Sequence, residues 1–170
     1  QTGRQVAAYI RYDGPMPEPS AAYDLVVIGS GPAGEKGAAQ AAYFGKKVAV
    51  IEAEPEPGGA AVHTGTLPSK TLREAALYLS GHRARNLYGI AVELAADATV
   101  PRLIARKNAI AAEASSAIRA NLSRHAVSYV RGRGRFADAN TVVVDTPEGE
   151  VRLGAQYVLI ATGSRPYRPA

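Results

Sequence analysis

The chain has 170 residues, of which 46% are hydrophobic, so it is long enough to bury one core of ordinary size. It contains no cysteine, which excludes disulfides, thiolate nucleophiles, iron–sulfur clusters and cysteine zinc sites. The net charge is +5, but the basic residues are scattered and are not interleaved with aromatic residues, so we do not expect nucleic-acid binding. The three histidines lack metal-ligand spacing, and no apolar run could span a bilayer. We therefore expect no metal, no membrane contact and a cytoplasmic location.

The N-terminal residues do not resemble part of a core. Prolines alternate with other residues over positions 15–19, which is typical of an extended linker. Met16 is the only methionine, and it lies shortly before the first predicted strand. We expect residues 1–15 to be an upstream extension or the product of a wrongly assigned start. The predicted organisation is a proline-rich linker over residues 1–22 and one domain over residues 23–170.

The most informative stretch of the chain has the order strand, glycine-rich turn, helix, strand and acid. Its two strands are short apolar runs rich in β-branched residues, and small and apolar residues fill the helix between them. This order is typical of a dinucleotide-binding site on a parallel sheet. In chain order the parts are residues 23–28, Gly29-Ser30-Gly31-Pro32-Ala33-Gly34, residues 36–44 ending at Gly45, residues 47–51, and Glu52.

Each glycine of this turn has a physical purpose in such a site. Gly29 allows a sharp turn out of the strand, Gly31 allows the backbone to approach a pyrophosphate, and Gly34 allows close packing of helix and strand. Free N–H groups and the helix dipole then face the phosphates. Glu52 can accept hydrogen bonds from the adenosine ribose, and its charge would repel a 2′-phosphate, which argues against NADP at this site. An ordinary glycine turn is the alternative.

The segment after this acid is predicted to be a loop followed by a helix. Residues 53–59 are rich in proline and glycine. Thr66 or a neighbouring residue could cap a helix that has Pro68 in its first turn and ends at Gly81. Lys70 would lie in that first turn, where the helix dipole disfavours a cation. Judged from spacing alone, Lys70 is a solvated surface lysine.

The middle of the chain combines an irregular stretch with a long helix. Residues 82–99 show no regular pattern, whereas the apolar positions between residues 100 and 122 follow helical spacing. We expect the apolar stripe of this helix to pack on the core. A dimer surface is the alternative use of the stripe.

The final third of the chain is rich in β-structure. Residues 127–136 alternate small or apolar side chains with three arginines, which either line a solvated edge strand or grip phosphate. A hairpin is predicted over residues 141–153. Residues 157–161 are predicted to form a buried strand that runs into Thr162 and Gly163. Such a strand delivers backbone groups to the carboxyl edge of the sheet, where these folds bind their ligands.

Four motifs in fixed order resemble the FAD-binding domain of the flavoproteins that include glutathione reductase and dihydrolipoamide dehydrogenase. Within this family of pyridine nucleotide-disulfide oxidoreductases, the chain is most similar to the soluble pyridine nucleotide transhydrogenases. The resemblance covers residues 23–169 and implies a Rossmann-like α/β fold, in which a parallel sheet is flanked by helices and carries an inserted β-meander in a three-layer ββα arrangement. The motifs are YDLVVIGSGPAG at residues 23–34, Gly58-Gly59 followed by GTLPSKTLRE at residues 65–74, residues 132–136, and LIATGSRP at residues 159–166.

The chain departs from the family at the redox-active pair of cysteines. Disulfide-reducing members carry C-x-x-x-x-C where this chain has Ala61 and Thr66, which excludes a dithiol route for dihydrolipoamide, glutathione or mercuric ion. The transhydrogenases resemble this chain at the second position but usually keep a cysteine at the first. A single cysteine cannot cycle as a disulfide, so we expect Ala61 to tune the flavin without abolishing hydride transfer. His63 is a second departure nearby, and we assign no role to it.

The resemblance also implies which residues bind FAD. The pyrophosphate would lie against the glycine-rich turn and the adenosine ribose against Glu52. Lys70, the implied catalytic residue, would place its ammonium near flavin N5, where charge develops as hydride arrives; this reverses the interpretation from spacing. The implied cofactor-binding residues are Gly29, Ser30, Gly31, Pro32, Ala33, Gly34, Glu52, Ala53, Gly58, Gly59, Ala60, Ala61, Gly65, Thr66, Lys70, Gly134, Ala161, Thr162 and Gly163.

The reaction implied by the resemblance is reversible hydride exchange between the NADPH/NADP and NADH/NAD couples, with FAD as the carrier. The family binds nicotinamide and forms its homodimer mainly through further domains that these 170 residues do not include. We therefore expect this chain alone to bind FAD weakly and to have no turnover. Three alternatives stay open: the FAD domain of a dihydrolipoamide dehydrogenase-like protein that has lost its cysteines, a stand-alone dinucleotide-binding module, and a classical NAD dehydrogenase.

Overall fold

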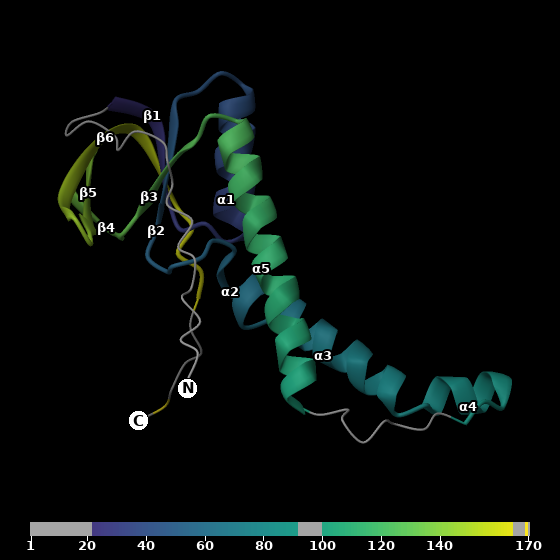
Figure 1. Ribbon diagram of the computed structural model, residues 1–170. Coiled ribbons are helices and arrows are strands. Elements are labelled where there is room, and N and C mark those ends of the chain that lie inside the picture. Colours follow the sequence, from purple (N-terminus) through teal and green to yellow (C-terminus); the bar gives the residue numbers. More distant parts are fainter. Residues whose placement is uncertain (1–21, 92–99, 165–168, 170) are drawn as a thin grey trace, which may run out of the picture.

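The computed structural model describes residues 22–91, 100–164 and 169, and Figure 1 shows how its strands and helices are arranged. The predicted N-terminal linker lies outside the described residues, apart from Ala22. No helix among the described residues is long and apolar enough to cross a membrane. In chain order the elements are β1 (Ala22–Ile28), α1 (Pro32–Tyr43), β2 (Val48–Glu52), α2 (Gly59–His63), α3 (Thr66–Leu79), α4 (His82–Tyr88), α5 (Val100–Arg124), β3 (Ser128–Arg131), β4 (Arg133–Asp138), β5 (Thr141–Thr146) and β6 (Gly149–Ile160).

A six-stranded sheet in the order β3-β2-β1-β6-β5-β4 organises the fold. Strands β3, β2, β1 and β6 run parallel to one another, whereas β5 is antiparallel to both β6 and β4. Strand β6 joins the parallel part of the sheet to the antiparallel part, because Gly154 in its middle pairs with Thr141 of β5 on one side and with Ala22 of β1 on the other. The apolar, β-branched sequences of β1 and β2 suit strands that are covered on both faces.

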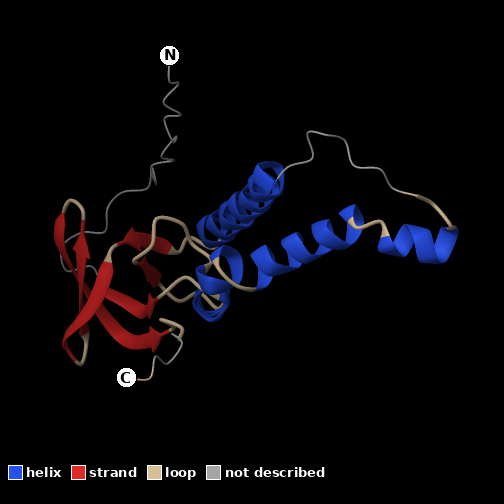
Figure 2. Cartoon of the chain, turned by 90° about the horizontal axis from the view of Figure 1, so that it is seen from below, coloured by secondary structure: helices blue, strands red, loops and turns tan. Residues whose placement is uncertain are grey.

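The parallel strands are buried between two apolar cores. On one face, Val27, Val50 and Leu122 belong to the core beneath helices α1 and α5. On the other face, Val26 and Val144 belong to a core that the curled strands β4 and β5 cover. Figure 2 shows the strands gathered on one side of the helices. Helices, parallel strands and meander thus form three layers, and the predicted Rossmann-like ββα fold is confirmed.

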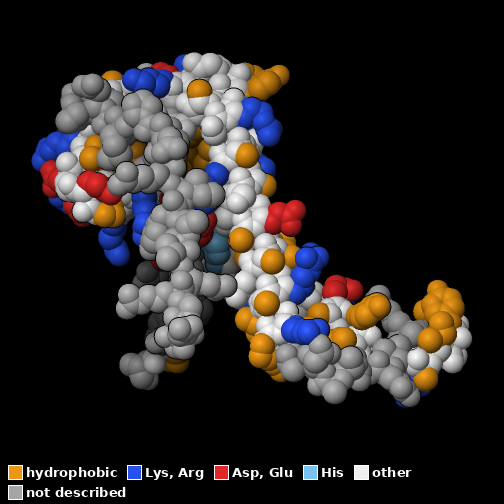
Figure 3. Space-filling model, in the orientation of Figure 1, with side chains coloured by type: hydrophobic (Ala, Val, Ile, Leu, Met, Phe, Trp, Pro, Cys, Tyr) orange, Lys and Arg blue, Asp and Glu red, His pale blue; other side chains and the backbone are white. Residues whose placement is uncertain are grey.

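We call α3, α4 and residues 100–112 of α5 the helical arm, which extends away from the sheet (Figure 1). Helix α3 packs beside α5, but large hydrophobic side chains of the arm stay exposed, such as Tyr78 (80%) and Tyr88 (74%). Figure 3 shows hydrophobic side chains gathered along this part of the molecule. The stripe of the long helix is buried on the core only toward its C-terminal end, at residues such as Leu122. The core-packing prediction is therefore right for only part of the helix.

Two strand predictions have the wrong boundaries. The predicted strand over residues 127–136 divides at Gly132 into β3 and β4. The Gly132 N–H donates to the carbonyl of Glu52 at 2.8 Å, and a Cβ on Gly132 would lie only 2.6 Å from the carbonyl oxygen of Asp145. This close approach carries the chain from the parallel layer into the meander. The second strand of the predicted hairpin and the strand over residues 157–161 are one continuous strand, β6, because it has neighbours of both directions.

Helix predictions also need correction. Residues 82–88 form α4, whose seven residues are too few for an apolar period to show in the sequence. Residues 92–99 lie outside the described part of the chain. Of the residues predicted as possible caps of α3, Gly65, the neighbour of Thr66, is the N-cap, and Thr66 is the first residue of the helix. Helix α1 begins at Pro32, earlier than predicted, because proline suits the first turn of a helix.

Candidate dinucleotide-binding site

The glycine-rich turn lies at the carboxyl edge of the sheet, between β1 and α1. Gly29 has a φ of +105°, and a Cβ on it would overlap the carbonyl of Ala161, the residue after β6. A Cβ on Gly34 would overlap the carbonyl of Gly29. Both positions therefore need glycine, because a strand end, a helix and a neighbouring strand end meet there.

Gly31 differs from these two glycines because the space beside it is open. Among the described residues, a Cβ on Gly31 would meet nothing closer than the Cα of Gly59, at 4.0 Å. Gly31 is also the N-cap of α1, and no side chain caps this helix. The first N–H groups and the positive end of the helix dipole can therefore face an anionic group. This geometry fits the pyrophosphate of a dinucleotide.

The acid predicted to bind ribose is held firmly at the end of β2. Glu52 is only 7% exposed, and Ser30 beside it is fully buried. The Glu52 Oε2 atom accepts hydrogen bonds from the Ser30 N–H at 2.9 Å and from the Ser30 hydroxyl at 2.5 Å. Its Oε1 atom accepts one from the Glu54 N–H at 2.9 Å. These donors fix the carboxylate beside the glycine-rich turn, and Oε1, which accepts only one of them, has a lone pair left for a ribose hydroxyl.

Gly58, the N-cap of α2, and Gly59, its first residue, lie against the glycine-rich turn. Gly58 has a φ of +120°, and its N–H donates to the carbonyl of Ser30 at 3.2 Å. Gly59 has a φ of +56°, and a Cβ on it would lie only 3.0 Å from the Cα of Gly31. Two backbone segments that are far apart in sequence therefore meet at this edge, and a side chain at Gly59 would separate them.

Helices α2 and α3 position the residues predicted to lie near the flavin. Helix α2 contains Ala60 and Ala61, and the Gly65 N–H donates back to the carbonyl of Ala60 at 2.6 Å. Thr66 begins α3, and Lys70 lies about one turn further along and is exposed. Among the described residues, Lys70 makes no hydrogen bond or ion pair, so none of them fixes its ammonium.

Strand β4 and the end of β6 complete the predicted set. A Cβ on Gly134 would meet the Ile51 side chain at 3.3 Å and that of Ile28 at 3.4 Å, so β4 packs over the ends of β2 and β1. The Ala161 N–H donates to the carbonyl of Ile28 at 2.9 Å, and the exposed Thr162 and Gly163 follow it. The remaining predicted residues, Pro32, Ala33 and Ala53, are exposed near the turn and the end of β2.

The three arginines of the predicted alternating strand lie on both edge strands of the sheet, and all three are exposed. Arg131 ends β3 and Arg133 begins β4. Arg135 donates to Glu150 at 2.7 Å and lies 3.7 Å from Asp145. Its contacts are therefore with the neighbouring strands of the meander, as in a solvated edge strand.

Sequence reasoning missed Tyr129 of β3. Its hydroxyl is buried and has no hydrogen-bond partner among the described residues. Burial raises the pKa of Tyr129 far above its ordinary value, and the nearby Glu52 carboxylate raises it further. The hydroxyl therefore keeps its proton. In the alternation over residues 127–136, position 129 shares a face with the exposed Arg131, so nothing in the pattern indicates a buried polar group near Glu52.

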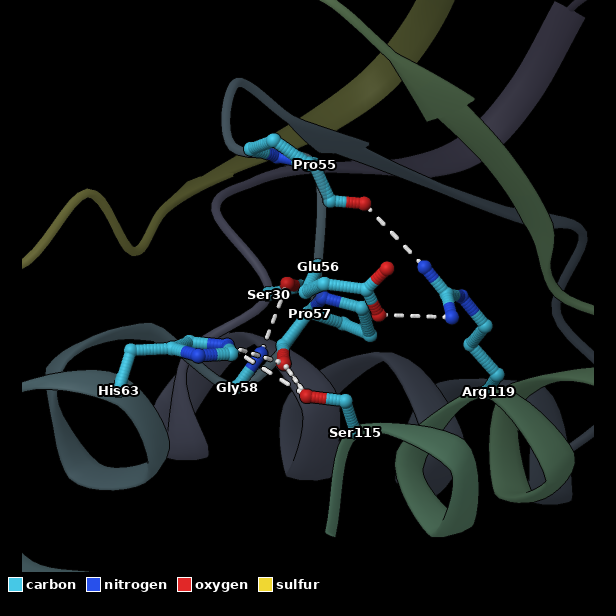
Figure 4. Close-up of polar contacts among 8 residues, drawn as sticks. All are labelled: Ser30, Pro55, Glu56, Pro57, Gly58, His63, Ser115 and Arg119. Atoms are coloured by element: carbon cyan, nitrogen blue, oxygen red, sulfur yellow. Dashed lines mark hydrogen bonds and ion pairs between the residues drawn. The ribbon is translucent and has the colours of Figure 1, made fainter. Parts of the chain in front are cut away.

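Sequence reasoning also missed the polar contacts that join α5 to the loop after β2 (Figure 4). Ser115 and Arg119 of α5 and His63 of α2 bind the loop over residues 55–57. One signal was present in the sequence: Ser115 is a polar residue within the apolar stripe of the long helix, close to Ile118. Such a serine, when fully buried, needs a hydrogen-bond partner.

The comparison with known families gives a direct result. The model of the family described as Pyridine nucleotide-disulphide oxidoreductase matches residues 23–170. The chain therefore belongs to this family, and the family predicted from its motifs is confirmed.

Two relatives with the same name show which members of the family this chain is similar to. The "Soluble pyridine nucleotide transhydrogenase" of Mycobacterium tuberculosis (strain ATCC 25177 / H37Ra) is 43% identical over 150 residues, which are 87% of this chain and 32% of the relative. A protein of the same name from Marinomonas sp. (strain MWYL1) is 42% identical over 149 residues, with the same shares of 87% and 32%. This chain thus spans about a third of the length of the curated relatives it matches, 32% in both cases.

A solved structure supports the fold. The chain is similar to the Cu(II) complex of the HOCl-induced flavoprotein disulfide reductase RclA from Escherichia coli, with a TM-score of 0.72 and 26% sequence identity. The match covers 86% of this chain and 30% of that structure. Sequence and structure therefore place the chain among flavoprotein oxidoreductases, although its own sequence carries no cysteine.

Proposed function

We propose that this chain binds FAD at the carboxyl edge of its sheet and is the FAD-binding part of a flavoprotein that exchanges hydride between the NADPH/NADP and NADH/NAD couples. The main support for the proposal is the position of Glu52. Ser30 and Glu54 hold its carboxylate beside the glycine-rich turn, in which the space next to Gly31 is open. This arrangement suits an adenosine ribose next to a pyrophosphate. The relatives named soluble pyridine nucleotide transhydrogenase support the choice of reaction.

Each part of the edge would hold a different part of the cofactor. The turn from Gly29 to Gly34 and the first N–H groups of α1 would bind the two phosphates, and Glu52 would accept hydrogen bonds from the ribose hydroxyls. Backbone groups at Gly134 would meet the adenine. The segment from Gly58 to Ala61 would lie along the flavin side, and Ala161 to Gly163 would close over the cofactor.

Lys70 would act on the reacting part of the cofactor. When bound, FAD supplies the ring that accepts a hydride from one nicotinamide and returns it to another. The Lys70 ammonium would place positive charge where the reduced ring is negative and thereby stabilise it. Lys70 is exposed and has no described partner to leave, which supports this role. Further parts of the protein would bind the nicotinamides.

The residues at the redox-pair positions favour hydride exchange over disulfide reduction. Ala61 and Thr66 cannot form a dithiol, so a dihydrolipoamide dehydrogenase-like activity would lack its usual electron path. A domain organisation with a linker over residues 1–22, homodimerisation and a cytoplasmic location stay predictions.

The FAD site is tested by titrating the purified chain with FAD and following the change in flavin absorbance at equilibrium, which also detects weak binding. We expect a saturable change, which Glu52→Arg abolishes because it reverses the charge beside the ribose. Glu54→Arg is the matched control, because Glu54 is exposed and contributes its backbone N–H to the site. Equal loss of flavin in both variants would contradict a specific role of Glu52.

The reaction is tested in a chimera, because this chain alone is expected to have no turnover. Residues 23–170 would replace the matching third of the Mycobacterium tuberculosis relative, and transfer of hydride from NADPH to thio-NAD would be followed by absorbance. We expect exchange in the chimera and a lower rate after Lys70→Met. A chimera that retains FAD but shows no exchange would refute the reaction and leave the FAD site standing.

A further inference from the structure

Side chains of α2 and α5 bind the loop that follows β2 (Figure 4). The Ser115 hydroxyl donates to the carbonyl of Pro57 at 2.8 Å, and His63 Nε2 lies 3.0 Å from the same oxygen. Arg119 donates to the carbonyl of Pro55 at 3.2 Å and pairs with Glu56 at 2.8 Å. Four contacts from two helices therefore converge on three successive loop residues.

The carbonyl of Pro57 determines how its two partners are protonated. A carbonyl can only accept hydrogen bonds, so His63 must carry a proton on Nε2, and the Ser115 hydroxyl must direct its proton at Pro57. The two side chains lie 3.5 Å apart and point at one acceptor instead of at each other. Ser115 is fully buried, so this hydrogen bond satisfies a hydroxyl that has no access to water.

The peptide group between Pro57 and Gly58 is therefore fixed at both ends. Its carbonyl is held by Ser115 and His63, and its N–H donates to the carbonyl of Ser30 at 3.2 Å. Gly58 continues from this peptide with a φ of +120°, a conformation that depends on how the preceding peptide is oriented. Turning the peptide over would break the contacts at both of its ends.

We propose that Ser115 and His63 are positioning residues for the flavin half of the cofactor. They orient the peptide between Pro57 and Gly58 and thereby hold the Gly58–Gly59 turn against Gly31. The inference rests on the proposed FAD site, in which this turn leads into the segment beside the flavin. The adenosine side depends less on these two donors, because it has direct support of its own: Ser30 and Glu54 donate to the Glu52 carboxylate.

Arg119 contributes less to this arrangement than Ser115. The Arg119 side chain is 30% exposed and that of Glu56 is 50% exposed, so water and salt weaken their ion pair. The buried hydroxyl of Ser115 has no such competitor. The positioning function is therefore assigned to Ser115 and His63, and Arg119 supports the loop at its outer end.

The test compares FAD with ADP, because ADP lacks the flavin half. Calorimetric titration of the full chain is expected to show FAD binding about fivefold weaker in Ser115→Ala, with ADP binding changed less than about twofold. Ser116→Ala is the matched control, since it makes the same change at the exposed neighbouring position. His63→Leu is expected to repeat the loss for FAD, and His63→Gln, which keeps an N–H donor, to restore part of it.

Each outcome decides the proposal. If Ser115→Ala and His63→Leu weaken FAD and ADP equally, the two residues are merely structural and the proposal is wrong. Unchanged FAD affinity in both variants overturns it as well. If a thermal melt shows that Ser115→Ala is not folded, the test uses the Leu and Gln variants of the half-buried His63 instead. A wild-type chain that binds ADP but not FAD would instead refute the proposed function, and this inference with it.

Discussion

Two regions of the molecule carry predicted site residues in very different surroundings. The nucleotide edge consists of residues 28–34 and 52–59, where Ser30 is fully buried and Glu52 is 7% exposed. The helical arm carries Lys70, which is exposed, on the same helix as Tyr78, which is 80% exposed. Contacts within this chain therefore define the geometry of the nucleotide edge. The position of Lys70 depends much less on the packing of the core.

This contrast has a simple physical origin. At Gly29 and Gly34 of the nucleotide edge, backbone segments approach so closely that an added Cβ would collide with a carbonyl, and the acid is held by buried donors. In the arm, helices contact one another along one side and leave the other to solvent. The same kind of substitution should therefore have a large effect at the edge and a small one in the arm. Two matched pairs of variants test this difference, and two further pairs test Tyr129 and Lys70.

The largest difference is expected for glycine to alanine. A Cβ at Gly34 would overlap the carbonyl of Gly29, whereas Gly89, after α4, has open space around it and a φ of +66°. We expect Gly34→Ala to lower the free energy of unfolding by about 3 kcal/mol through overpacking. Gly89→Ala should cost about 1 kcal/mol from backbone strain alone. Urea unfolding measures both, and equal costs would refute the contrast between the regions.

The next difference concerns acids. Glu52→Gln would place an amide N–H₂ or a weaker acceptor among the donors of Ser30 and Glu54, and we expect a loss of about 2 kcal/mol in unfolding free energy. The matched change in the arm is Glu74→Gln, which breaks only an exposed ion pair with Arg73 and should cost about 0.5 kcal/mol or less. Comparable losses in urea unfolding would show that the Glu52 contacts are not maintained in solution.

A smaller effect of opposite sign is expected for Tyr129→Phe. The change removes a buried hydroxyl that has no partner among the described residues, so we expect a gain of about 1 kcal/mol at pH 7. Tyr78→Phe in the arm is the control, because Tyr78 is 80% exposed and should change stability very little. A loss of stability in Tyr129→Phe would mean that the hydroxyl has a partner in solution.

The Tyr129→Phe variant also tests how the stability of the chain depends on pH. The pKa of Tyr129 is raised in the folded chain above its unfolded value of about 10, so the folded state holds this proton more tightly. The stability that comes from this tighter proton binding is fully present below pH 10 and is lost as the pH rises through the raised folded pKa. The stability of wild type relative to Tyr129→Phe should therefore fall between about pH 10 and 11. A difference that stays constant across this range would contradict the raised pKa.

The smallest effect on stability is expected for Lys70→Met. Lys70 is exposed, so urea unfolding should change by about 0.5 kcal/mol or less. In the FAD-loaded chain the same variant should lower the reduction potential of the flavin, because positive charge near the reduced ring is removed. The matched change Lys46→Met, at an exposed position between α1 and β2, should leave the potential unchanged. Equal potentials in both variants would remove the reason to call Lys70 catalytic.

Local patterns explain what could be predicted from the sequence. The run from Tyr23 to Glu52 contains its own strand, turn, helix and strand signals, and each lies next to its structural partner in the chain. The buried Glu52 and the close approach at Gly34 follow from that run. The hairpin joined by residues 146–149 is equally local. These are the parts that the structure confirms.

The features that escaped prediction depend on contacts between distant segments. The break at Gly132 exists because Asp145 of another strand lies against it, and alternation within residues 127–136 carries no trace of that neighbour. Ser115 and Pro57 are 58 residues apart, so no spacing rule could pair them. The exposure of one side of the helical arm likewise depends on which segments pack against α3, and the periodicity of its sequence does not identify those segments.

The assignment of the nucleotide edge as the dinucleotide site is tested most directly by a fluorescence titration of FAD with the purified chain, with ADP as competitor. We expect saturable quenching of FAD fluorescence that ADP reverses and that Gly34→Ala abolishes, because the nucleotide edge binds the part that the two ligands share. Quenching that ADP cannot reverse, or that survives Gly34→Ala, would contradict the assignment of this edge as the dinucleotide site.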